Sequence, residues 1–162
     1  MQNAKDTFYI ALRDRLTSVN PGRTMELRSV TRPGIMIEDA ESPVPLIPLD
    51  AFVLRWTDVE VESHLALPLV QMRCEIHYAT AGTQALGGLD RGRLLEEMDA
   101  ELLQMLALAS TRKMNYSTSP ATAMQTFVFW DQPEYGPLDT LRDQIGRIVT
   151  VTVWSWQEAG EK

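Results

Sequence analysis

The stretch from Val70 to Tyr78 alternates between apolar and polar side chains without a fault. Because successive side chains of a β-strand point to opposite sides, this pattern predicts a strand with one side in a core and the other facing water or a partner. The inward set is Val70, Met72, Cys74, Ile76 and Tyr78, and the outward set includes the candidate interface residues Arg73, Glu75 and His77.

Other segments also have the composition of strands. Residues 52–62 alternate and predict a long strand, whose far half has one solvated face. Two β-rich runs, residues 124–131 and 147–156, close the chain, and we expect them to be antiparallel neighbours. Residues 24–30 and 34–39 predict a short strand and its hairpin partner.

Two segments show helical spacing of apolar residues. In Lys5 to Ser18 these include Phe8 and Leu12, and residues 20–22, Asn-Pro-Gly, end the pattern. In Asp90 to Ala109 the apolar face contains Leu94, Leu95, Met98, Leu102, Met105 and Leu106.

The order of these elements predicts one α+β domain over residues 1–162. Most strands follow strands, so we expect a mostly antiparallel or mixed sheet of about five to six strands, with two main helices packed on one face. Extended loops are expected around residues 40–49, which contain three prolines, and around residues 79–89 and 110–123.

Composition excludes several classes of protein. The chain has 15 Lys and Arg against 22 Asp and Glu, a net charge of -7, which argues against a nucleic-acid-binding surface. No segment approaches the roughly 18 apolar residues of a membrane span, so we expect no membrane partner and a cytoplasmic location. A single Cys supplies no disulfide framework.

Candidate chemistry is sparse. Cys74 and His77 are three residues apart on a strand and therefore point to opposite faces, which does not suit a thiolate pair. Two His and one Cys are too few for a typical zinc site. We therefore predict no enzyme and no catalytic, metal or cofactor residues.

A carboxylate row on the long strand is open to three interpretations. Asp58, Glu60 and Glu62 are spaced for acid–base chemistry or a hard cation, but a solvated strand face with anti-aggregation charge is the simpler interpretation. The third is an acidic surface that lines a pore.

Aromatic residues and charge are unevenly distributed. Trp154 and Trp156 share a strand side with Ile148, which suits either core positions or interface anchors, and we expect one of them in the core. Residues 1–34 carry a net charge of +3 and residues 35–70 of -6, which favours head-to-tail association.

The order of elements resembles that of the tail terminator, or tail completion, proteins of long-tailed bacteriophages and phage-derived particles. The resemblance runs through the helix AKDTFYIALRDRL, the Pro-rich excursion, the strand VQMRCEIHY, the helix LLEEMDAELLQMLAL and the closing RIVTVTVWSW. It covers most of the chain but contains no diagnostic motif.

The resemblance implies a structural subunit of a ring, usually hexameric, that ends the tail tube and joins it to the head or connector. Asp58, Glu60 and Glu62 then become candidates for the ring lumen, through which DNA passes, or for an inter-subunit face. The protein would be assembled in the cytoplasm of a bacterial host and kept in the virion tail. Two alternatives remain: a ligand-binding or enzymatic domain with a pocket between the sheet and residues 90–109, and another tail or baseplate adaptor.

Overall fold

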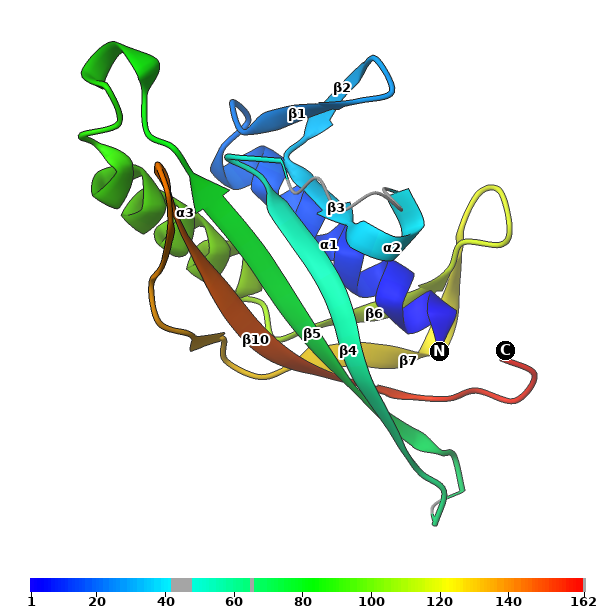
Figure 1. Ribbon diagram of the computed structural model, residues 1–162. Helices are drawn as coiled ribbons and strands as arrows, with labels where there is room; N and C mark the ends of the chain where they lie inside the picture. Colours follow the sequence, from blue (N-terminus) through cyan, green and yellow to red (C-terminus); the bar gives the residue numbers. More distant parts are fainter. Residues whose placement is uncertain (42–47, 65, 162) are drawn as a thin grey trace.

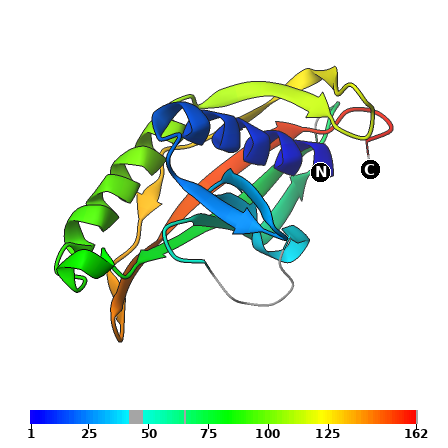
Figure 2. The same ribbon diagram turned by 90° about the horizontal axis from the view of Figure 1, so that it is seen from above.

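The computed structural model describes residues 1–41, 48–64 and 66–161. It has an α+β fold in which a curled mixed sheet packs against two main helices (Figure 1). The sheet curls so that its two ends lie on either side of the first helix (Figure 2).

Both predicted main helices are present. They are α1 (Gln2–Val19) and α3 (Arg91–Leu106). Phe8 and Leu12 of α1 and Met98 and Leu102 of α3 are fully buried, as the helical spacing predicted, and Leu16 of α1 is fully buried as well. The remaining helical elements of the described residues are a four-residue helix, α2 (Glu38–Glu41), and a 3-10 turn, η1 (Gln84–Leu86).

The sheet contains more strands than predicted. Its order is β3 (Ile35–Ile37), β4 (Phe52–Glu62), β5 (Leu69–Thr80), β10 (Gln144–Trp156), β7 (Thr122–Trp130) and β6 (Ser110–Asn115). Two short strands, β8 (Glu134–Tyr135) and β9 (Asp139–Leu141), also pair with β10. Among the strand pairs of the described residues, β3 with β4 alone is parallel, and the expected antiparallel pairing of the two closing runs is confirmed in β7 and β10.

The predicted loop over residues 110–123 is wrong, because Ser110–Asn115 forms β6 at the edge of the sheet. Its side chains are mostly polar because an edge strand buries little of its surface. Residues 116–121 alone connect it to β7. Residues 110–115 therefore lack the apolar alternation by which a strand is recognised in a sequence.

The N-terminal hairpin also differs from its prediction. The partner of β1 (Thr24–Leu27) is β2 (Val30–Pro33), through a two-residue turn at Arg28 and Ser29. Residues 35–37, expected in that hairpin, form β3 and pair with β4 instead.

The other two predicted loops are described in part. Of the expected loop over residues 40–49, positions 42–47 lie outside the described residues. In the expected loop over residues 79–89, β5 continues to Thr80, and Asp90 then accepts hydrogen bonds from the backbone N–H of Thr83 and from its hydroxyl, both at 2.9 Å.

The core is built on the helical side of the sheet. The ring of Phe8 contacts Trp56 and Trp130 edge to face, with centroids 5.8 and 5.2 Å apart. All five inward residues predicted for β5 are at most 2% exposed. The strand pattern thus sets which face receives α1 and α3.

A buried ion pair fixes the C-terminal segment to the sheet. The ammonium of Lys113 on β6 lies 2.7 Å from a carboxylate oxygen of Glu161, and both side chains are at most 1% exposed. Lys113 also donates a hydrogen bond to the carbonyl oxygen of Trp156. Residues 157–161 therefore belong to the folded unit. Among the described residues, no helix is long and apolar enough to cross a membrane.

Candidate interface on the outer face of the sheet

All eight candidate lumen and interface residues lie on one face of the sheet. They are Asp58, Glu60, Glu62, Arg73, Glu75, His77, Trp154 and Trp156. We call this face the outer face, because it is opposite α1 and α3. In the antiparallel pairing of β5 with β10, Arg73 lies opposite Thr152 and His77 opposite Ile148, so these four side chains point to the same side. The alternate residues of both strands, such as Cys74 and Val151, are fully buried on the other side.

A β-bulge places the acidic row on this face. In β4, Trp56 lies opposite Cys74 but Asp58 lies opposite Arg73, which makes Thr57 an extra residue. Strict alternation would have put Asp58 on the same side as the core residue Trp56. The bulge resets the alternation, so that Asp58, Glu60 and Glu62 join Arg73 and Gln71 on the outer face.

The tryptophans of β10 are also on the outer face, which contradicts the expected core position for one of them. Val149, Val151 and Val153 occupy the core side, so Trp154 and Trp156 point away from it and are half-buried. The ring of Trp154 stacks on Phe129, with centroids 5.8 Å apart, and its indole N–H donates to the side-chain oxygen of Gln71 at 3.1 Å.

The hairpin of β4 and β5 forms one end of the sheet (Figure 1), where β10 stays paired with β5 as far as Leu69. We call residues 58–62 and 69–73 the arm. On its inner side Val59 and Val61 of β4 are 38% and 51% exposed, whereas Val70 and Met72 of β5, opposite them, are fully buried. The arm therefore presents an acidic side and an apolar side.

Several charges on and beside the outer face are paired within the subunit. Arg55 of β4 lies 2.6 Å from Glu38 of α2, and this hydrogen bond lowers the pKa of Glu38. The imidazole of His77 lies 3.0 Å from Glu75. Arg32, from the positive region of the sequence, pairs at 2.5 Å with Glu41, from the negative one. The charge segregation is thus partly neutralised by folding.

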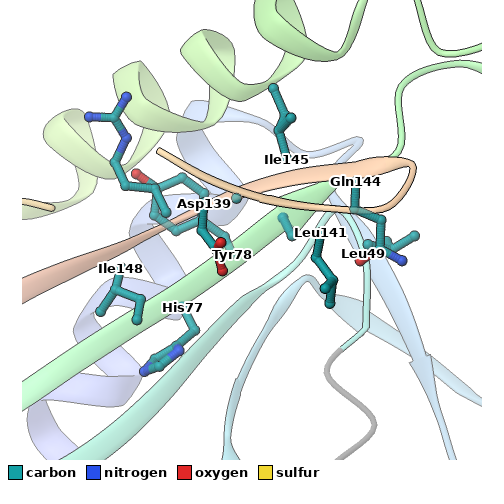
Figure 3. Close-up of a pocket in the computed structure, with 11 residues that line it drawn as sticks. Leu49, His77, Tyr78, Asp139, Leu141, Gln144, Ile145 and Ile148 are labelled. Carbon is teal, nitrogen blue, oxygen red and sulfur yellow. The ribbon is translucent and has the colours of Figure 1, made fainter. Parts of the chain in front are cut away.

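A shallow hollow of about 280 Å³ lies at the end of the outer face away from the arm (Figure 3). Its floor is formed where Gly146 and Ala79 pair, since neither carries a large side chain. The side chains of His77, Asp139 and Ile148 surround it. Leu95, Met98, Leu102 and Met105 of α3 pack in the core, and a second hollow of about 480 Å³ lies beside the end of this helix, lined by Leu103, Leu106 and Trp130 among others.

The described residues offer little chemistry. Burial raises the pKa of the Cys74 thiol, which disfavours its reactive thiolate form. No group of three or more His, Cys, Asp or Glu residues in the described ranges is arranged to hold a metal ion.

Sequence reasoning missed part of this face. Phe127 and Phe129 of β7 lie on it beside Trp154, and Arg112 of β6 lies over the ring of Phe127. The alternation of Phe127 and Phe129 with the buried Val128 and Trp130 was the available signal. A scan with protein-family models finds no match to the chain, and a search of curated protein sequences finds no significant match.

Proposed function

We propose that this chain is a structural subunit that assembles into a ring and ends the tail tube of a phage or phage-like particle, where it joins the tube to the head or connector. The observation that carries the proposal is the convergence of all eight predicted residues on the outer face. The inner face of the same sheet is filled by the helices. The inner face of the sheet thus forms the core, and the outer face is available for association.

The composition of the outer face supports association between proteins. Trp, Phe and Arg are enriched where proteins bind one another, and here Trp154, Phe127 and Arg112 are partly accessible on one surface. The acidic row suits either a lumen through which DNA passes, because carboxylates repel phosphates, or an inter-subunit face that meets positive charge on the next copy. The partners proposed are other copies of the chain, the tube and the connector.

Solution mass is the direct test. We expect light scattering across a range of concentration and salt to give a closed oligomer near six subunits, and negative-stain images to show rings. A chain that stays monomeric under all these conditions, and that also fails to bind purified tail tubes, contradicts the proposal.

A ligand-binding role is a second candidate, and the hollow beside His77 and Asp139 is the observation that favours it. If the hollow binds a small molecule, that molecule should raise the melting temperature of the protein. Ala79→Leu, which fills the hollow, would then abolish that rise. Retention of the rise in this variant would exclude the hollow as the site.

A further inference from the structure

The arm ends in an open strand edge. β3 pairs with β4 only from Phe52 to Leu54, and in the described part of the chain no strand pairs with that edge farther along. An open edge presents backbone donors and acceptors that a further strand can use. Asp58, Glu60 and Glu62 follow this edge, and all three are exposed. A strand that adds here must therefore tolerate or neutralise three carboxylates.

The β1–β2 hairpin is a second projection. Among the described residues its two strands pair only with each other and not with the main sheet. A two-stranded hairpin is marginally stable alone, so a partner that extends it would stabilise it. Leu27 and Val30 lie opposite each other on one side, and Val30 is 60% exposed.

The turn of this hairpin holds an arginine in an unfavourable conformation. Arg28 and Ser29 have φ angles of 52° and 64°, in the left-handed region where Gly and Asn are preferred. The side chain of Arg28 is exposed at the tip. The turn therefore places a positive charge at the exposed tip of the hairpin.

The two projections are complementary and lie at opposite ends of the molecule (Figure 1). One carries three carboxylates beside exposed Val59 and Val61, and the other carries Arg28 at its tip beside exposed Val30, with exposed Glu26 farther back on β1. Every copy has one of each. A contact between them can therefore repeat head to tail from copy to copy.

We propose that the β1–β2 hairpin of one copy adds to the open edge of β4 in the arm of a second copy, with Arg28 against the acidic row. The inference rests on the proposed ring and assigns its subunit contact. Backbone hydrogen bonds along the edge, valine contacts and opposite charges together hold the two copies.

Charge reversal tests this contact. Arg28→Glu and the triple variant Asp58→Lys, Glu60→Lys, Glu62→Lys should each fold but associate at least tenfold more weakly, as measured by light scattering and sedimentation. An equimolar mixture of the two should recover association as a ring in which the variants alternate, since the hairpin of each attracts only the arm of the other. Arg142→Glu is the matched control, because Arg142 is also exposed in a hairpin turn with a φ of 56°.

Circular dichroism and the melting temperature establish that each variant is folded. A ring that forms normally with Arg28→Glu overturns the contact but leaves the proposed function standing. A mixture that associates no better than either variant alone also overturns the contact. A wild-type chain that forms no ring, and does not bind tail tubes, overturns the proposed function and the contact together.

Discussion

The indole of Trp154 lies nearly parallel to the ring of Phe129, with 14° between their planes, on the outer face of the sheet. The two residues come from neighbouring strands and lie directly opposite each other. Both are half-buried in the subunit. The pair therefore stabilises the sheet and offers an aromatic surface to a neighbour.

The stack makes a measurable contribution to folding. A cross-strand aromatic pair contributes about 0.5–1.5 kcal/mol beyond its buried area, so a double-mutant cycle of Trp154→Ala and Phe129→Ala should give a coupling energy in that range. Urea denaturation measures it. Pairing Phe129→Ala with Thr150→Ala, on the same face of β10 but outside the stack, is the control and should show additivity. A coupling energy near zero would show that the stack contributes no stability.

The C-terminal ion pair should be costly to break. Removal of one partner from a buried pair costs about 3–5 kcal/mol, because the other charge stays buried and uncompensated. We expect Glu161→Gln to lower the free energy of unfolding substantially, and Lys113→Met with Glu161→Leu to recover much of it. Denaturant titration checks both. A single variant as stable as the wild type would contradict the burial of this pair.

The same carboxylate predicts a dependence of stability on pH. Burial acts to raise the pKa of Glu161, but hydrogen bonds from Lys113 and from the Glu158 backbone, with nearby positive charge, lower it below the unfolded value near 4.5. Its contribution is therefore present above about pH 4.5 and is lost as the pH falls through the lowered pKa. The stability difference between wild type and Glu161→Gln should shrink at acid pH, whereas that for exposed Glu96→Gln should be small throughout.

Deletion of Thr57 tests the bulge. Without this residue, Asp58 follows Trp56 directly and still points outward, so each side chain keeps its face while the strand straightens. We expect a folded protein whose arm is redirected and whose assembly is impaired, as seen by circular dichroism and light scattering. Normal ring formation by this variant would show that the bend does not matter.

The thiol of Cys74 should be protected in the native protein. Its side chain is fully buried and burial raises its pKa, so we expect an aromatic disulfide reagent to react only as fast as the protein opens. The reaction should become rapid in denaturant. Cysteine placed at exposed Gln71 on the same strand is the control and should react at once.

Periodic burial made much of the fold predictable. β5, α1 and α3 follow from apolar spacing because each has one face against a common core. Apolar spacing cannot predict elements that bury few of their side chains. β6 and the β1–β2 hairpin are held by strand pairing and by contacts with distant residues, which composition does not record.

The candidate site was predictable residue by residue but not as a surface. Alternation correctly assigned Arg73, Glu75 and His77 of β5 to the outward side. In β10 the sequence allowed either side for Trp154, and the structure places Val149, Val151 and Val153 in the core and Trp154 outside it. The bulge at Thr57 depends on cross-strand register, which arises only when β4 and β5 meet. The convergence on one face is thus a tertiary property.

The acidic row also restricts which symmetry two copies can adopt. If the open edges of β4 in two copies met antiparallel, as in a twofold dimer, carboxylates from both chains would crowd together, and like charges across strands are destabilising. A self-complementary sheet through this edge is therefore disfavoured at neutral pH. The row therefore favours a heterologous contact, in which this edge meets a different surface of the next copy, over an isologous one.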